Sequence, residues 1–469
     1  MRKIGVFLLI LVCLLHCTPL AATAATEESI TSGCSTLQAQ YAIGGDEAYT
    51  GTADAAILYE LDTQTLVYAH NPDDIIDPSG LVKLMTALIV LEEGDLGDMV
   101  TVERSTLNSV GAGSVSVGLQ AGEIVSLRDL LYCVMVSSAN DAAAVMAEHV
   151  AGSQQAFVDK MNEKAATLGC VSTHFANVHG LQNDSQHSTA RELAIITAEA
   201  LKNELFAQMF GIVNYQLPAT NMSEARTLTT TNYMMDASSK KYYDERVTGG
   251  KPAAATTADR SMICTAENEN GRYLCVIISA TAKTSGYAVR EYTNFIEAKQ
   301  LLDLGFKGFA VQQVLGGDQP FGMYAVANGE NSVVVGADQE VYALLPVKFD
   351  QSLLQFQDVK DQERLVAPLK KGTAVGTLQI LYGDIVVGEV ELLARHNVAL
   401  VGSTIEEVRK PGTVEQILNI LKWVGIVILG LAVVLAVVVL ILRQVNIVRY
   451  QKRKKQQRNR RREGANELE

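Results

Sequence analysis

Cysteine is scarce in this sequence and never falls in a metal-binding pattern. The 469 residues include seven cysteines, and no two of them form a C-x-x-C pair. The spacing therefore predicts neither a zinc site nor a disulfide framework. Cys264 and Cys275 flank a predicted turn at 267–271 and could face each other across a hairpin. Small buried thiols are the simpler interpretation of these side chains.

Two common catalytic patterns are also missing. The sequence contains no Gly-x-Ser-x-Gly elbow, which excludes an ordinary α/β-hydrolase. His174, His179 and His187 lie close together in the sequence, but their spacing matches no standard ligand pattern. We therefore predict no metal and no cofactor.

Positive charge is scarce outside the two termini. The net charge of the whole chain is −13, yet the segment from Arg443 onward contains ten basic and three acidic residues. The chain between the termini therefore carries a net charge of about −22. A surface this acidic argues against nucleic acid as a partner, because the phosphate backbone repels it.

The two termini carry apolar segments of different length. Residues 1–24 have a basic start, a short apolar core and a small-residue end, which is the pattern of a secretory signal peptide. Residues 423–442 form an uncharged apolar run of twenty residues, long enough to span a bilayer. The basic flank at 443–469 belongs on the cytoplasmic side. We therefore expect a single-pass protein of the cell membrane with an extracytoplasmic bulk and a cytoplasmic C-terminus.

Between these termini the sequence predicts two domains. Residues 25–49 are rich in small and polar residues and are interpreted as a spacer. Residues 50–305 mix strand-like and helix-like segments. Residues 308–401 consist of short alternating segments separated by Gly, Asp and Asn, which is typical of a small all-β domain. A linker at 402–422 leads into the apolar run.

The first domain is expected to combine strands with helices. Asp77 and Pro78 are a typical helix cap and first-turn residue, and Ser126 to Asp129 resembles a capping box. A break is expected at Ser137–Ser138. The strands are predicted at 55–61, 66–68 and 249–282, and the helices at 77–94, 126–137, 138–150 and 297–304.

The segment 77–86 carries most of a catalytic motif. It reads Asp-Pro-Ser-Gly-Leu-Val-Lys-Leu-Met-Thr at the start of a predicted helix. This pattern resembles the nucleophile motif of the D-alanyl-D-alanine carboxypeptidases, the low-molecular-mass penicillin-binding serine peptidases. In their S-x-x-K motif the serine stands three residues before the lysine. Three residues before Lys83 stands Gly80, so the nucleophilic hydroxyl is missing.

Two further segments resemble the other motifs of this family. Residues 138–140 read Ser-Ala-Asn and match the S-x-N motif in sequence and position. The K-T-G motif is represented at 251–253 by Lys-Pro-Ala, in which only the lysine is kept. Proline cannot donate a main-chain hydrogen bond, and the alanine adds a methyl group where a glycine lets the substrate approach. The substrate-docking strand is thus altered as well as the nucleophile.

The resemblance covers residues 50–400 and implies both a fold and a set of roles. The implied fold is an α+β, β-lactamase/transpeptidase-like domain with an antiparallel sheet and a helical subdomain, followed by the β-rich domain. By family role, Lys83 would be the base, and Ser138 and Asn140 the proton relay and substrate contact. Lys251 would anchor the substrate carboxylate. The implied ligand is a peptidoglycan stem peptide, and a protein of the cell envelope is the other partner considered.

Three functions are open to such a family member. The favoured one is an inactive pseudoenzyme that binds peptidoglycan peptides, since glycine has no side chain to acylate. The second is an active carboxypeptidase that uses Ser79 as a shifted nucleophile. Ser79 stands four residues before Lys83, and residues four apart on a helix share a face. Ser79 would then lie about 100° around the helix from the usual attack position. The third is a non-catalytic envelope scaffold.

Overall fold

The structure is a computed structural model that describes residues 50–111, 114–286, 288–359 and 364–402, together with Lys422 and Gln444. The expected signal peptide and spacer lie outside the described residues, as do nearly all of the linker, the apolar run and the basic tail. Within the part of the chain that is described, no helix is long and apolar enough to cross a membrane.

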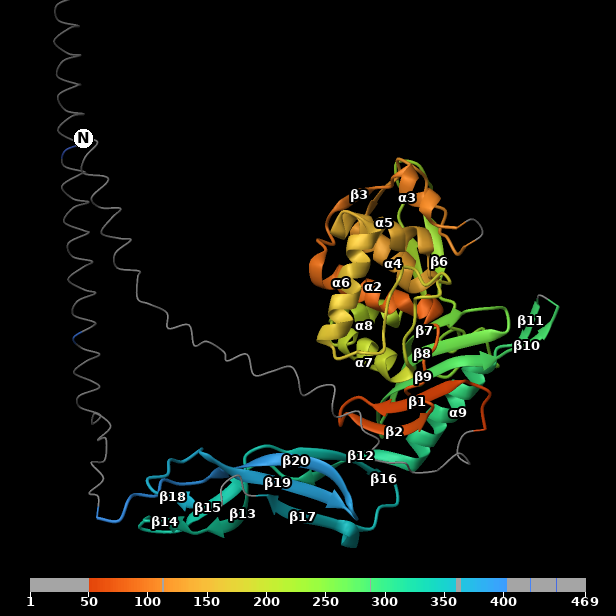
Figure 1. Ribbon diagram of the computed structural model, residues 1–469. Helices are drawn as coiled ribbons and strands as arrows, with labels where there is room; N and C mark the ends of the chain where they lie inside the picture. The colour runs from red at the N-terminus through yellow and green to blue at the C-terminus, as the bar shows by residue number, and fades with distance from the viewer. Residues whose placement is uncertain are drawn as a thin grey trace, which may run out of the picture. The chain divides into compact units, whose positions relative to one another are not determined.

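A five-stranded antiparallel sheet is the centre of the larger domain (Figure 1). Its strand order is β2-β1-β9-β8-β7, so the N-terminal strand pairs with a strand more than two hundred residues later in the chain. The last strand in this order, β7, forms one edge. The expected strand segments are confirmed as β1 (Ala55–Glu60), β2 (Thr65–His70), β7 (Val247–Ala254), β8 (Asp259–Asn268) and β9 (Gly271–Thr281).

The two faces of this sheet bury separate apolar clusters, because successive side chains of a strand point to opposite faces. Ile263 and Val276 belong to the cluster beneath the helical subdomain. Met262 and Ile277 belong to the cluster beneath α9 (Thr293–Gly308). Figure 1 shows the other helices on the side of the sheet opposite α9. They are α2 (Val82–Glu93), α3 (Arg104–Ser109), α4 (Leu127–Ser137), α5 (Asn140–Ala151), α6 (Gln154–Thr167), α7 (Ala190–Ala200) and α8 (Glu204–Phe210).

Several local signals in the sequence are confirmed. The Ser126 side chain accepts a hydrogen bond from the Asp129 N–H and caps α4. Helix α4 ends at Ser137, and Ser138 has a left-handed backbone conformation. Helix α5 then begins at Asn140. The predicted helix at 297–304 is longer than expected and runs from Thr293 to Gly308.

The remaining short elements connect these layers. They are the 3₁₀ turn η2 (Ser79–Leu81) and the strands β3 (Met99–Thr101), β4 (Ile124–Ser126), β5 (Asn214–Leu217), β6 (Arg226–Thr229), β10 (Lys283–Ser285) and β11 (Ala288–Glu291). The pairs β3–β4, β5–β6 and β10–β11 each form a two-stranded antiparallel sheet.

The predicted hairpin containing two cysteines is present. Cys264 on β8 stands directly opposite Cys275 on β9. Both are free, fully buried thiols, in agreement with the simpler interpretation.

The C-terminal domain is built from strands, as its alternating sequence predicts. A five-stranded antiparallel sheet has the order β13-β15-β20-β19-β17, and β12 pairs with β16. The strands are β12 (Phe309–Leu315), β13 (Gln319–Tyr324), β14 (Val326–Ala327), β15 (Val333–Ala337), β16 (Val341–Pro346), β17 (Leu354–Val359), β18 (Leu365–Val366), β19 (Ala374–Tyr382) and β20 (Ile385–Ala394), with the turn η3 (Gln351–Leu353).

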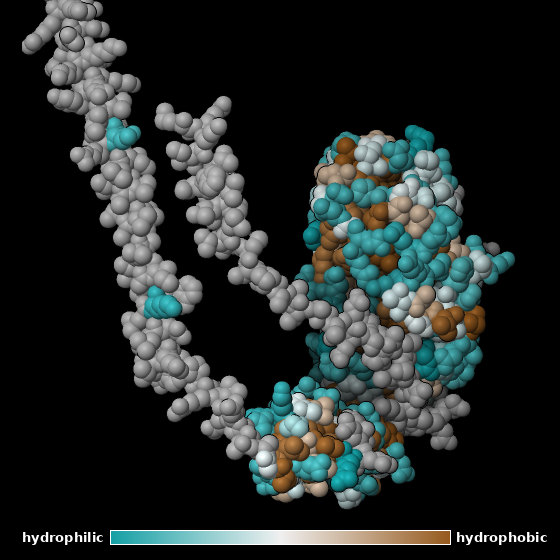
Figure 2. Space-filling model, turned by 60° about the vertical axis from the view of Figure 1, so that its left-hand side comes forward, coloured by the Kyte–Doolittle hydropathy of each residue, from teal (hydrophilic) through white to brown (hydrophobic). Residues whose placement is uncertain are grey.

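This domain also carries exposed apolar side chains. Figure 2 shows hydrophobic atoms, coloured brown, among hydrophilic ones on its surface. The exposed apolar side chains of the domain include Phe321, Met323 and Phe356.

A second, small compact unit comprises 327–331, 366–368 and the described residues from 398 onward. Within this unit Gly329 pairs with Leu400 in an isolated bridge.

A loop at 177–181 fixes the beginning of α2. The Thr86 hydroxyl donates to the Val178 carbonyl at 2.7 Å. Gly180 has φ +79°, and a Cβ atom on it would lie only 1.9 Å from the Ser79 carbonyl oxygen. The loop therefore passes against the turn that precedes α2, and only a glycine allows so close an approach.

We predict that Gly180→Ala destabilises the protein by at least about 2 kcal/mol, because the new methyl group overlaps a main-chain oxygen. Gly152→Ala is the matched control, since Gly152 has φ +77° but no atom near its Cβ position. The control should cost only about 1 kcal/mol of backbone strain. Urea unfolding of both variants tests the difference, and equal losses would contradict the packing argument.

Candidate functional site

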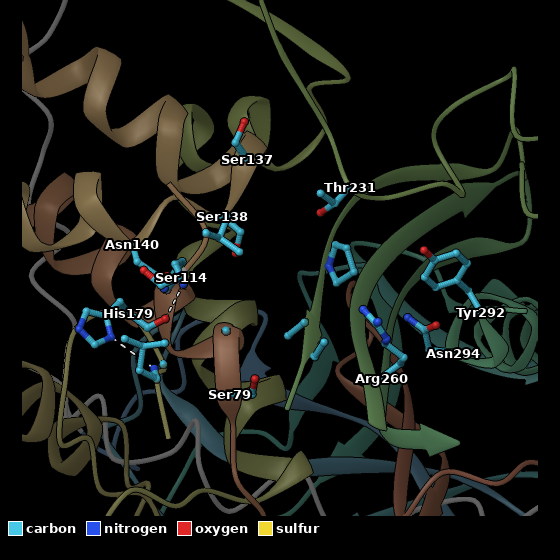
Figure 3. Close-up of a pocket in the computed structure, with 18 of the residues that line it drawn as sticks. Ser79, Ser114, Ser137, Ser138, Asn140, His179, Thr231, Arg260, Tyr292 and Asn294 are labelled. Carbon is cyan, nitrogen blue, oxygen red and sulfur yellow. Dashed lines mark hydrogen bonds between the residues drawn. The ribbon is translucent and has the colours of Figure 1, made fainter. Parts of the chain in front are cut away.

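A cleft of about 420 Å³ lies between the helical subdomain and strand β7. Its lining includes Ser79, Gly80, Lys83, Ser138 and Asn140, which are five of the six residues singled out from the sequence. Figure 3 shows Ser138, Asn140 and His179 on one side of the cleft and Arg260, Tyr292 and Asn294 on the other. The fold thus brings together segments that are far apart in the chain.

Gly80 occupies the place from which a side chain would enter this cleft. A Cβ atom on Gly80 would lie 3.8 Å from Ser138 Oγ and 3.4 Å from Ala253 Cβ. It would therefore face the second and third motifs at ordinary contact distances. A serine fits at this position, and the glycine leaves it without a hydroxyl.

Ser79 does not have the helical relation to Lys83 that the sequence suggested. Helix α2 begins only at Val82, and Ser79 lies in the preceding 3₁₀ turn with φ +49°. Its N–H donates to Asp77 Oδ1 at 2.9 Å. The expectation that Ser79 and Lys83 share a face of one regular helix is therefore wrong, because the left-handed residue changes the direction of the chain. Ser79 lines the cleft and is 5% exposed.

Lys83 lies at the bottom of the cleft as a buried amine. Its Nζ donates a hydrogen bond to the His179 carbonyl oxygen, and its side chain is nearly inaccessible to solvent. Burial lowers the pKa of Lys83 well below its usual value, and the positive charge of Lys251 lowers it further. The amine is therefore chemically suited to accept a proton, as the predicted role of base requires.

Lys251 is buried between β7 and the helical subdomain. It lies on β7, but its Nζ donates to the Val134 carbonyl oxygen of α4 at 3.0 Å, and it is not among the residues that line the cleft. Burial lowers its pKa to about 7. In this structure Lys251 connects the sheet edge to the helical subdomain, and its proposed role as a carboxylate anchor stays a prediction.

Ser138 and Asn140 are positioned by the junction between α4 and α5. Ser138 has φ +59° and is the C-cap of α4, where its N–H donates a hydrogen bond to the Cys133 carbonyl oxygen. The Asn140 N–H donates to the Val115 carbonyl at 2.8 Å, which ties the start of α5 to another wall of the cleft. Non-glycine residues in the left-handed region are uncommon and concentrate at functional sites. Ser79 and Ser138 both fit this description.

The three histidines of the sequence cluster separate in the fold. His174 and His187 exchange main-chain hydrogen bonds in an isolated bridge, whereas His179 lines the cleft. Its Nδ1 accepts from the Leu181 N–H at 3.3 Å, so its proton belongs on Nε2. Burial, and then the charge of Lys83, lower the pKa of His179 to about 4. Among the described residues no group of three or more candidate ligands is placed to hold a metal ion.

Sequence reasoning missed the other half of the cleft. Arg260, Tyr292 and Asn294 line it together with Tyr233 and Phe295. Arg260 belongs to a strand and Asn294 to the first turn of a helix. No motif marks either residue, so only the tertiary structure identifies them.

Comparison with known proteins identifies similar families and structures. A model of the D-alanyl-D-alanine carboxypeptidase family matches residues 44–282, and a model of the C-terminal domain of penicillin-binding protein 5 matches residues 309–399. The crystal structure of penicillin-binding protein 5 from Haemophilus influenzae is similar with a TM-score of 0.62 at 26% sequence identity. That similarity covers 75% of this chain and 98% of the other.

Two curated relatives are similar over most of their length. D-alanyl-D-alanine carboxypeptidase DacF of Bacillus subtilis is 26% identical over 75% of this chain and 87% of the relative. DacA of Escherichia coli K12 is 30% identical over 70% of this chain and 78% of the relative.

The fold is therefore the mixed α/β fold of the penicillin-binding proteins, with antiparallel sheets and a C-terminal all-β domain. The chain belongs to the D-alanyl-D-alanine carboxypeptidase family of cell-wall enzymes.

The buried amine of Lys251 makes a testable contribution to stability. Its pKa is about 7 in the folded state against 10.5 for a free lysine, so the unfolded chain binds more protons between these values. The free energy of unfolding should therefore rise as the pH increases from 7 to 10. In Lys251→Met the rise should be smaller.

Urea unfolding at pH 7 and pH 9 measures this difference. Lys240→Met is the control, because Lys240 is exposed and its replacement should leave the pH dependence unchanged. Equal pH dependence in the natural chain and in Lys251→Met would contradict the burial argument.

Proposed function

We propose that this chain binds the peptide ends of peptidoglycan in its cleft without forming an acyl-enzyme. The observation that carries the proposal is the position of Gly80. A side chain at this position would face Ser138 Oγ and Ala253. The site that a nucleophilic serine would occupy holds only a hydrogen atom. A nucleophile and its base act as a unit, so Lys83 alone should not restore turnover.

The charge of the cleft supports a ligand that carries a carboxylate. Among the described residues that line it, Arg260 is a cation, and none is an aspartate or glutamate. Stem peptides end in a carboxylate, whose burial is favoured next to such a group. Ser138 and Asn140 add polar side chains beside the amine of Lys83.

We further propose that the protein acts outside the cytoplasm and is anchored in the membrane. The support is the sequence: a signal-like segment at 1–24, an apolar run at 423–442 and a basic flank after it. The domain boundaries at 50–305 and 308–401 belong to the same proposal.

An active carboxypeptidase that uses Ser79 is the second candidate. It is supported by one observation, namely that Ser79 lines the cleft in a strained left-handed conformation. A scaffold that uses surfaces outside the cleft is the third. Loss of function on substitution of Ser138 or Asn140 would separate the first proposal from the scaffold.

The first experiment is labelling of the purified full-length chain with a fluorescent penicillin. We expect no covalent label on the natural chain and a gain of label in Gly80→Ser, because the new hydroxyl would face Ser138 Oγ in the cleft that Lys83 also lines. Gly308→Ser is the matched control, since Gly308 has open space around its Cβ position and is not among the residues that line the cleft.

Label on the natural chain that disappears in Ser79→Ala would overturn the proposal in favour of the active enzyme. If Gly80→Ser stays unlabelled, the triple variant Gly80→Ser, Pro252→Thr, Ala253→Gly tests whether the docking strand is also impaired. No label on that variant either would show that the cleft does not accept such ligands.

A second experiment measures binding directly. Isothermal titration with an acetylated peptide that ends in D-Ala-D-Ala should show binding that Asn140→Ala weakens about fivefold to tenfold, the effect of one hydrogen bond. Asn108→Ala, on an exposed position of α3, should leave the affinity unchanged. Absence of binding by the natural chain would contradict the proposed function.

A further inference from the structure

The loop beside α2 is closed at its base by two histidines. His174 and His187 exchange main-chain hydrogen bonds, with N···O distances of 2.8 Å and 3.0 Å. The residues between them include His179, whose carbonyl oxygen accepts from Lys83, and Gly180, which packs against the turn before α2. The isolated bridge is therefore the base of a segment that holds one wall of the cleft.

The two imidazole rings lie on the same face of this bridge. Directly opposite residues of an antiparallel pair share a face. The ring centres of His174 and His187 are 6.0 Å apart, with an angle of 32° between the ring planes. Their spacing in the sequence matches no ligand pattern, because only the bridge makes them neighbours.

His187 is held in the form that a metal ligand needs. Its Nδ1 lies 2.9 Å from the Ser185 carbonyl oxygen. Because a carbonyl oxygen can only accept, Nδ1 of the neutral ring carries the proton and Nε2 keeps its lone pair. Metal-bound histidines almost always donate their second ring N–H to a carbonyl, a carboxylate or water. This hydrogen bond is independent of the ring spacing and also points to a metal ligand.

The distance between the rings fits a single metal ion. With a metal–nitrogen bond of about 2.0–2.1 Å, the ion lies about 3.2 Å from each ring centre. A tetrahedral site then places the two ring centres about 5.2 Å apart, whereas they are 6.0 Å apart in this structure. His174 is exposed, so rotation of its side chain can close this small difference.

The two imidazoles also select the class of ion. Within the described ranges no third histidine, cysteine or acidic residue joins the pair, so water would supply the remaining ligands. Imidazole nitrogen suits Zn²⁺, Cu²⁺ and Ni²⁺, whereas Mg²⁺ and Ca²⁺ prefer oxygen ligands. The site is therefore suited to a divalent transition-metal ion.

We infer that His174 and His187 form a metal clip, that is, a two-histidine site for a divalent transition-metal ion such as Zn²⁺. The clip joins the two ends of the 174–187 loop. An ion that binds only the folded chain stabilises it, and a cross-link at the base of a loop restrains the whole loop. Neither histidine lines the cleft, so the inference does not depend on what the cleft binds.

Isothermal titration of the purified, tag-free full-length chain with ZnCl₂ tests the clip, after bound metal has been removed with EDTA. Zinc should bind to the natural chain, and MgCl₂ should not. His174→Gln and His187→Gln should each weaken zinc binding at least about tenfold, because a chelate loses one of its two protein ligands. The double variant should bind no more weakly than either single variant. His149→Gln, an exposed histidine of α5, is the matched control and should leave the affinity unchanged.

Thermal unfolding gives a second readout. An excess of zinc should raise the midpoint of unfolding of the natural chain and of His149→Gln by about 2–8 °C. EDTA should reverse this shift, and neither His174→Gln nor His187→Gln should show it. Circular dichroism of the zinc-free variants checks that each is folded.

The inference is overturned if zinc binds equally well to the natural chain and to His174→Gln or His187→Gln, or if it does not bind at all. An equal loss of affinity in His149→Gln would show general binding to surface histidines and would also refute the clip. Binding of the D-Ala-D-Ala peptide is measured on the zinc-free chain, so failure of the proposed function is a separate result.

Discussion

Two lysine amines are buried against main-chain carbonyl groups, and the arrangement of the cleft depends on them. Lys83 donates to the His179 carbonyl and Lys251 to the Val134 carbonyl. Neither forms a salt bridge with a carboxylate among the described residues. Burying a charged amine without a counter-ion is expensive, so burial lowers the pKa of both amines. The first contact holds α2 to the loop that carries Gly180, and the second holds β7 to α4. The walls of the cleft are fixed by these contacts.

The same packing explains why the cleft keeps its shape although position 80 has no side chain. The loop around Gly180 must pass close to the Ser79 carbonyl, and this packing does not involve a side chain at position 80. The absence of a side chain at position 80 therefore does not disturb the contacts that shape the site. Acyl transfer through a serine needs a hydroxyl in the cleft, whereas non-covalent binding of a peptide does not.

Much of this architecture could be predicted from local sequence. The capping box at Ser126, the break at Ser138 and the three strands of 247–281 follow from signals that act within a few residues. Ser79 was placed wrongly because its left-handed conformation is imposed by tertiary packing rather than by helix propensity. The position of the Lys251 amine likewise depends on a contact with a helix more than a hundred residues earlier.

The sequence by itself determined the family, the order of the motifs and the absence of a hydroxyl at position 80, because these are matters of residue identity and spacing. Only the tertiary structure decided which groups share the cleft. Arg260 and Asn294 belong to a strand and a helix that carry no motif, and they meet because the sheet edge lies beside the start of α9. Such proximity arises from long-range packing of the sheet, which no local pattern records.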